Sequence, residues 1–135
     1  MPVTVCFDAS FLMLAAKFHM DIIAETENLL QRHIQFSIPD IVVGELEGLA
    51  RRPGPAGRDA RVALELISAH KIRQVSSTEQ ANADKALVEA SAQPGVIVAT
   101  ADLDLREAIR DRRKPVIFFR EKAKLELDGI EPSYW

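Results

Sequence analysis

Val96-Ile97-Val98-Ala99-Thr100 is an unbroken run of small and β-branched residues, with Pro94-Gly95 before it and Asp102 shortly after it. Apolar runs of this length indicate strands that are covered on both faces, as in parallel sheets. A helix is expected directly afterwards, from about Leu103 to Arg112. A buried strand that is followed at once by a helix favours an α/β fold.

The same alternation of strand and helix extends through the rest of the chain. Four further apolar runs are predicted as strands: Val3–Phe7, Ile34–Ile38, Ile72–Val75 and Val116–Phe119. Helices are predicted between them, beginning near Phe11 after a Ser10 cap, at Asp21, at Ile41 behind Pro39, at Arg61, and at Thr78 or Glu79. The stretch Arg52–Gly57 is expected to be a surface loop. The expected architecture is a single-domain, three-layer α/β/α fold with a mainly parallel five-stranded sheet.

A chain of 135 residues, 47% of them hydrophobic, is long enough for one compact domain with its own core. We place this domain at residues 1–127 and expect residues 128–135 to form an extended tail. The single cysteine, Cys6, excludes an intramolecular disulfide framework and a multi-cysteine zinc site. No apolar stretch approaches the ~18 residues of a membrane span, and no signal peptide is recognisable. A cytoplasmic protein with no membrane partner is therefore expected.

Aspartates follow two of the predicted strands. Asp8 comes directly after Val3–Phe7, and Asp102 comes just after Val96–Thr100. Ligands of open α/β sheets bind outside the carboxyl ends of the strands, so both residues lie where functional groups are expected. Aspartate is also a good helix N-cap, which leaves a purely structural role open for each. The two carboxylates would meet if their strands were neighbours in the sheet.

Three more carboxylates can reach the same edge. Glu45 lies in the helix after the second strand, Asp84 lies near the start of another helix, and Asp104 follows Asp102 by two residues. Ordinary solvent exposure of Glu45 and a helix-dipole contact of Asp84 are the alternatives. A site of carboxylates alone suits Mg²⁺ or Mn²⁺ rather than zinc, because hard cations prefer oxygen ligands. Since crowded carboxylates repel each other, we expect the pKa of at least one to be raised without metal.

Four motifs, in this order, resemble those of the PIN-domain nucleases. They are Asp8-Ala9-Ser10-Phe11-Leu12, Glu45-Leu46, Ala83-Asp84-Lys85-Ala86-Leu87 and Val98-Ala99-Thr100-Ala101-Asp102-Leu103-Asp104-Leu105. The segments Asp111–Ile117 and Lys124–Leu127 are most similar to the archaeal Fcf1-like branch, which is related to ribosomal-RNA-processing nucleases and often grouped with VapC-type toxins. Lys85 stands where relatives often have a second acid, so weak binding of a second ion is expected.

The resemblance implies metal-dependent hydrolysis of RNA phosphodiester bonds, by a VapC-type toxin or an rRNA-processing nuclease. The catalytic residues that it implies are Asp8, Glu45, Asp84 and Asp102. The ligands that it implies for Mg²⁺ or Mn²⁺ are Asp8, Asp84, Asp102 and Asp104. Divalent ions neutralise the phosphodiester, lower the pKa of bound water and stabilise the leaving oxygen. Ser10 and Thr100 are expected to orient the carboxylates through hydrogen bonds, with helix capping as the alternative for both hydroxyls.

The net charge of −3 hides an uneven distribution. Residues 105–124 carry eight basic and three acidic side chains, a net charge of +5, so the remaining chain carries −8. This asymmetry favours a surface that faces a polyanion, although a solvated protein face is the common alternative. The predicted RNA-binding residues are Arg110, Arg112, Arg113, Lys114 and Arg120, together with Lys122 and Lys124.

Two functions from different classes remain open. The first is the ribonuclease, with RNA as substrate and an antitoxin or a ribosome-assembly protein as candidate partner. The second is a non-catalytic RNA-binding or scaffold protein in ribosome biogenesis, whose metal site is too weak for turnover. A homodimer is expected from the family alone. A phosphoaspartate receiver domain fits less well, because the last predicted strand ends in Phe118-Phe119-Arg120 rather than in a lysine.

Overall fold

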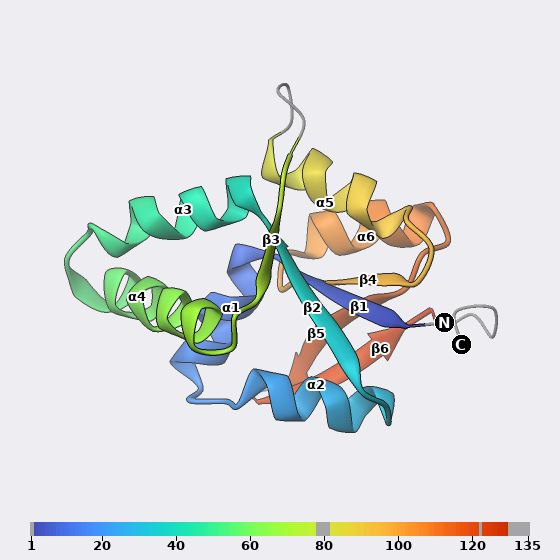
Figure 1. Ribbon diagram of the computed structural model, residues 1–135, viewed down its shortest axis with the longest axis horizontal. Helices are drawn as coiled ribbons and strands as arrows, with labels where there is room; N and C mark the ends of the chain where they lie inside the picture. Colours follow the sequence, from blue (N-terminus) through green and yellow to red (C-terminus); the bar gives the residue numbers. More distant parts are fainter. Residues whose placement is uncertain (1, 78–81, 122, 130–135) are drawn as a thin grey trace.

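The computed structural model describes residues 2–77, 82–121 and 123–129. These residues form one six-stranded sheet in the order β3-β2-β1-β4-β5-β6 (Figure 1). The strands are β1 (Val3–Phe7), β2 (Ile34–Pro39), β3 (Arg73–Val75), β4 (Val96–Ala99), β5 (Val116–Glu121) and β6 (Lys124–Asp128). The helices are α1 (Ala9–Lys17), α2 (Ile22–Leu30), α3 (Asp40–Ala50), α4 (Gly54–Ala69), α5 (Ala83–Ser91) and α6 (Leu103–Asp111).

Strand β1 is central and pairs in parallel with β2 on one side and with β4 on the other. Its last residue, Phe7, lies opposite Ala99, the last residue of β4. The two strands therefore end side by side at one edge of the sheet, which we call the carboxyl edge. Because the strand order reverses between β1 and β4, this is the position at which ligands of open α/β sheets bind.

Helices cover both faces of the sheet. Figure 1 shows α1 and α2 on one side of the strands and α5 and α6 on the other. This division follows from chain connectivity, because right-handed crossovers that run from β1 toward β3 and from β3 toward β5 leave the sheet on opposite faces. The expected three-layer α/β/α arrangement with a mainly parallel sheet is confirmed.

Aromatic rings pack along one side of the core. Phe7 and Phe11 are both fully buried, and their ring centroids lie 5.9 Å apart. Phe7 also stacks on Phe36, and Phe11 packs against Phe119 at 4.8 Å. These contacts tie α1 to β1, β2 and β5, so the start of α1 is held firmly against the carboxyl edge.

The expected number of five strands is wrong, because β6 adds a sixth. This strand runs antiparallel to β5 at the end of the sheet, with Ile117 opposite Leu127. Its sequence, Lys-Leu-Glu-Leu-Asp, alternates and carries charges, as an edge strand does, so it lacks the continuous apolar run of the inner strands. Asp128, assigned from sequence to the extended tail, is its last residue, and residues 130–135 lie outside the described part of the chain.

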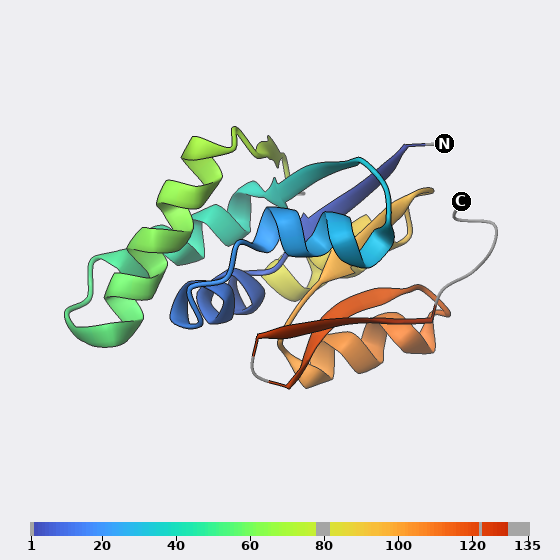
Figure 2. The same ribbon diagram turned by 90° about the horizontal axis from the view of Figure 1, so that it is seen from below.

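The expected loop at Arg52–Gly57 is also wrong in part, because α4 begins inside it at Gly54. Proline is tolerated in the first turn of a helix, so Pro55 does not delay the start. Helices α3 and α4 pack against each other and form a helical arm that projects from the sheet in both views (Figure 1 and Figure 2). The Arg61 guanidinium donates to the Ala50 carbonyl oxygen at 2.9 Å and so fixes the turn of the arm.

The start predicted for the fifth helix, at Thr78 or Glu79, lies outside the described residues, and α5 itself begins at Ala83. Of the described helices, none is long and apolar enough to cross a membrane.

Candidate active site

Asp8 is a buried acid at the carboxyl edge that accepts three hydrogen bonds. It is the N-cap of α1, which corrects the expectation that Ser10 begins this helix, and only 7% of its surface is exposed. Its Oδ1 accepts a hydrogen bond from the Ala9 backbone N–H at 2.8 Å. Its Oδ2 accepts bonds from the hydroxyls of Ser10, at 2.8 Å, and Thr100, at 2.6 Å. Three donors therefore hold a buried carboxylate in one orientation.

The two hydroxyls also connect the strand ends. The oxygens of Ser10 and Thr100 lie 3.3 Å apart. Ser10 Oγ accepts a bond from the Ala101 N–H at 3.1 Å, and Thr100 Oγ1 accepts one from the Asp102 N–H at 3.0 Å. The loop that carries Asp102 is thus fixed relative to Asp8 by the two side chains expected to orient the carboxylates.

Asp102 is the N-cap of α6. Its Oδ1 accepts the backbone N–H of Asp104 at 2.9 Å and that of Leu105 at 3.2 Å. Capping is therefore a real role of Asp8 and of Asp102. Both capping bonds of Asp102 go to Oδ1, so Oδ2 takes no part in them. The cap also holds this carboxylate at the same edge as Asp8.

Glu45 and Asp84 come from the helices α3 and α5, and both are exposed. The pKa of Glu45 is raised, first by partial desolvation and then by the charges of Asp8 and Asp84. The pKa of Asp84 is raised by partial desolvation and then by the charges of Asp102, Asp8 and Asp104. The expected repulsion between carboxylates is therefore present, and it connects acids from four separate elements.

We call Asp8, Glu45, Asp84, Asp102 and Asp104 the acid cluster. Its donor set consists of oxygens alone, which fits Mg²⁺ or Mn²⁺ better than softer metals. Across the described residues, however, no three acidic, histidine or cysteine side chains already stand close enough together to hold one metal ion.

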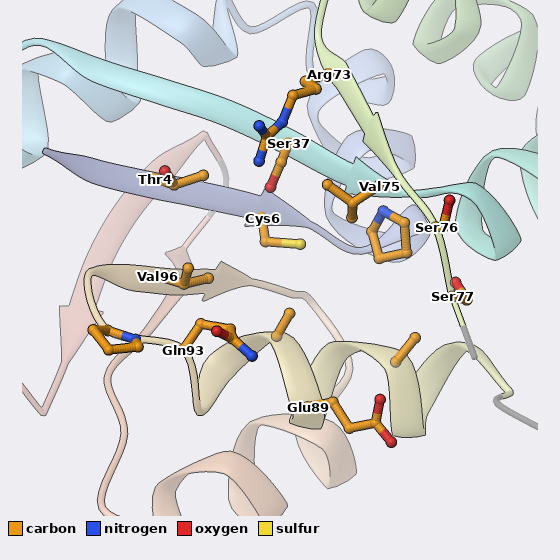
Figure 3. A pocket seen from close by; sticks show the side chains of 14 residues that line it. Thr4, Cys6, Ser37, Arg73, Val75, Ser76, Ser77, Glu89, Gln93 and Val96 are labelled. Atoms are coloured by element: carbon orange, nitrogen blue, oxygen red, sulfur yellow. The ribbon is translucent and has the colours of Figure 1, made fainter.

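One pocket has no residue of the acid cluster in its lining. It measures about 460 Å³ and opens between α5 and the face formed by β1, β2 and β3 (Figure 3). Cys6, Ser37 and Arg73 come from the strands, Glu89 lies on the facing helix, and Gln93 lies in the turn that follows this helix. Burial raises the pKa of the Cys6 thiol to about 11, so this cysteine is not a nucleophile near neutral pH.

The predicted RNA-binding residues do not lie together. Helix α6 begins directly after its N-cap Asp102 and runs back toward the opposite edge of the sheet, so its end is about 14 Å from its start. Arg112, Arg113 and Lys114 follow that far end. Arg110 is engaged within the protein, because it donates to the Lys114 carbonyl oxygen at 3.0 Å and pairs with Asp128 at 3.4 Å.

Arg120 lies at the carboxyl edge instead. Strand β5 continues beyond its last pairing with β4, at Ile117, and turns into β6. Arg120 pairs with Glu126 across this hairpin at 3.4 Å, and Lys124 lies opposite Glu121. Lys122 is outside the described residues.

A second group of cations was missed at the sequence level. Arg51, Arg52 and Arg58 are exposed at the tip of the helical arm. Residues 51–61 contain four arginines and one acid, a signal that was available in the sequence. We did not single out these arginines, because Arg52–Gly57 was interpreted as an ordinary surface loop.

Comparison with known proteins places this geometry in context. A family model described as a PIN like domain matches residues 5–122. The chain is 28% identical over 127 residues to a protein named Ribonuclease VapC4 from Methanocaldococcus jannaschii, covering 91% of this chain and 95% of that protein. The solved PIN domain endonuclease Utp24 superposes with a TM-score of 0.80 at 22% identity, covering 96% of this chain and 93% of that one. A domain of a functionally unknown protein from Methanocaldococcus jannaschii superposes with a TM-score of 0.58 at 19% identity, covering 96% and 99%.

Proposed function

Because the chain belongs to the PIN-like domain family, we propose that it is a divalent-metal-dependent ribonuclease that hydrolyses RNA phosphodiester bonds at the acid cluster. The observation that carries this proposal is the fixed Asp8 carboxylate. Its bonds to Ser10 and Thr100 hold it in the loop network that also carries Asp102. Preorganised carboxylates of this kind are what a metal-dependent phosphodiesterase needs.

Two lines of similarity support the proposal without fixing the substrate. The relative from Methanocaldococcus jannaschii is named a ribonuclease, and the superposed PIN domain is described as an endonuclease. Both a toxin and an RNA-processing enzyme are compatible with these names. The two functions differ in the RNA that each would cut.

We assign the metal ligands to Asp8, Asp84 and Asp102, with Asp104 as a further ligand directly or through water. A divalent ion bound there supplies charge neutralisation, an acidified water and a stabilised leaving oxygen. Ser10 and Thr100 fix the orientation of the Asp8 carboxylate by donating to its Oδ2. We assign Glu45, whose pKa is raised by partial desolvation and by the charges of Asp8 and Asp84, to holding the ion or orienting the attacking water.

The RNA backbone is proposed to cross the carboxyl edge between two basic projections. The tip of the helical arm supplies Arg51, Arg52 and Arg58, and the β5–β6 hairpin supplies Arg120 and Lys124. Phosphate contacts of this kind position an RNA without reading its sequence. Arg110, Arg112, Arg113 and Lys114 can join this track only where the RNA continues along α6 toward the other edge of the sheet.

The direct test is cleavage of a mixed pool of cellular RNA with Mn²⁺, Mg²⁺ or EDTA. We expect cleavage with either metal, none with EDTA, and none by the Asp8→Asn or Asp102→Asn variants. Glu65→Gln, an exposed acid on α4, is the matched control and should cleave like the wild type.

A non-catalytic RNA-binding protein is the second candidate. It is favoured by one observation, that Lys85, a cation, directly follows Asp84 at the position where PIN relatives often have a second acid. Under this alternative the wild type and Asp8→Asn bind RNA equally, and neither cleaves it with any metal.

A further inference from the structure

A small pocket adjoins the acid cluster and is not needed for the proposed chemistry. Its volume is about 180 Å³, and it opens between α1, the loop after β4, the first turns of α6 and the end of β5. Its lining includes Thr100, Asp102, Leu103, Arg106 and Phe118. Asp102 belongs to the acid cluster, and Thr100 donates a hydrogen bond to Asp8. The pocket and the acid cluster therefore share a wall.

The pocket contains a fixed planar cation. The Arg106 guanidinium lies 3.5 Å from the centroid of the Phe118 ring. One of its nitrogens donates to the Asp128 carboxylate at 3.2 Å, and 29% of the Arg106 side chain is exposed. One flat face of the guanidinium is thus stacked on Phe118, and the ion pair with β6 keeps it in that position.

Leu103 is the most exposed large apolar side chain among the described residues, at 59%. It contributes little to the core, and it follows directly after Asp102 in the first turn of α6. The exposure of this leucine beside a group of carboxylates is not explained by packing in the core. Its position on the pocket wall makes it an apolar contact surface for a ligand.

The size and lining of the pocket select its ligand. At about 180 Å³ it is well below the ~300 Å³ at which pockets for drug-sized molecules begin, so it takes one small ring system. Apolar walls and a planar cation favour a flat aromatic group, because bases stack on aromatic rings and on guanidinium planes. The larger pocket of Figure 3 has no aromatic residue in its lining and offers no such surface.

We propose that this pocket binds one unpaired RNA base, that of a nucleotide adjoining the bond that the acid cluster cleaves. The base lies against Leu103 and the guanidinium of Arg106, and its own phosphate is thereby brought to Asp102 and Asp8. The inference rests on the proposed ribonuclease function, and it restricts the substrate to single-stranded or locally opened RNA, because a paired base cannot enter.

The test compares the binding of two probes in EDTA, where the proposed nuclease is inactive. One is a short, fluorescently labelled RNA of uridines, and the other has the same riboses and phosphates but no bases. We expect the wild type to bind the uridine probe about tenfold more tightly, as measured by fluorescence anisotropy. Leu103→Ala and Arg106→Lys should lose most of this preference, since the lysine keeps the charge but not the flat stacking surface. Binding of the base-free probe should change little.

Val62→Ala is the matched control, because Val62 is the other exposed large apolar side chain of the described residues, at 41%, and it lies on α4. It should keep the full preference for the uridine probe. An equal preference in the wild type and Leu103→Ala, or no preference in the wild type, would overturn the pocket assignment. Cleavage with Mn²⁺ is scored separately: a protein that prefers the uridine probe but never cleaves RNA refutes the proposed function and leaves the base pocket standing.

Discussion

The Thr100 hydroxyl donates a 2.6 Å hydrogen bond to Oδ2 of Asp8, although the two residues are 92 positions apart in the chain. Thr100 is fully buried, and it follows the last residue of β4, while Asp8 follows the last residue of β1. The bond therefore joins two neighbouring strand ends and fixes the carboxylate around which the acid cluster is arranged.

Replacing Thr100 by valine should show what this bond contributes. Thr100→Val keeps the shape but removes the donor, so Asp8 Oδ2 retains only the bond from Ser10. We expect a loss of about 1–3 kcal/mol in the free energy of unfolding. We also expect Mn²⁺ affinity to fall about 10- to 100-fold, because a ligand loses its orienting partner. Urea unfolding and Mn²⁺ titration measure the two effects, and Thr100→Ser, which keeps the hydroxyl, should preserve both properties.

The acids should differ in what they do to stability without metal. Asp84 is exposed and repelled by its neighbours, so Asp84→Asn should melt in EDTA at or above the wild-type temperature. Asp8→Asn should melt lower, because its amide NH2 cannot accept, so that either the Ala9 N–H or the hydroxyls of Ser10 and Thr100 lose their acceptor. Mn²⁺ should raise the free energy of unfolding less in both variants than in the wild type. For the wild type, the expected increase is about 2.7 kcal/mol at a Mn²⁺ concentration of a hundred times the dissociation constant. A full Mn²⁺ response in Asp8→Asn would remove Asp8 from the ligand set.

Stability in EDTA should depend on pH through Glu45 and Asp84. Both carboxyls have a folded-state pKa above the ordinary value, so the folded state binds more protons than the unfolded state over the interval between the two. Their contribution is therefore fully present at pH below the ordinary pKa and is lost as pH rises through the folded-state pKa. The difference in unfolding free energy between the wild type and a Glu45→Gln/Asp84→Asn variant, followed by urea unfolding across acidic pH, should change in this direction. A difference that is independent of pH would contradict the crowding of these acids.

The helical arm should contribute more to RNA affinity than the far end of α6. Arg51→Ala/Arg52→Ala removes two exposed cations from the arm, and Arg112→Ala/Arg113→Ala removes two from the residues that follow α6. Each lost phosphate contact with single-stranded RNA should lower the salt dependence of binding by about 0.7 in the slope of log affinity against log salt. We expect this flattening for the arm variant and an almost unchanged slope for the other. The reverse ranking would favour the RNA path expected from the charge distribution alone.

Two glycines of the helical arm should respond oppositely to alanine. A Cβ at Gly57 would meet the Arg52 carbonyl oxygen, a backbone atom that cannot move away easily. A Cβ at Gly48, within α3, would meet nothing. Gly48→Ala should therefore stabilise the protein by about 0.5–1 kcal/mol, and Gly57→Ala should destabilise it. Thermal melts of the two variants check this pair, and equal shifts would mean that the turn of the arm is not closely packed.

The sequence by itself determined the layered α/β fold and the edge at which the acids gather. Both follow from local signals, because runs such as Val96–Thr100 indicate buried strands regardless of the rest of the chain. Parallel strands end at the same edge, so aspartates at positions 8 and 102 were expected to share it once their strands became neighbours. The pairing of Phe7 with Ala99 confirmed that condition. The roles of the acids in metal binding remain predictions.

Only the tertiary structure decided which surfaces accompany those acids. The direction of α6 carries Arg112 and Arg113 away from Asp102, although only a few residues separate them in sequence. The small pocket lined by Leu103 and Arg106 lies between α1, α6 and β5. Strand β6 forms because β5 offers an edge with which an alternating, charged strand can pair. Such features depend on how distant segments pack and on the direction in which each helix runs. Periodicity and spacing along one chain do not determine the packing of distant segments or the direction of a helix.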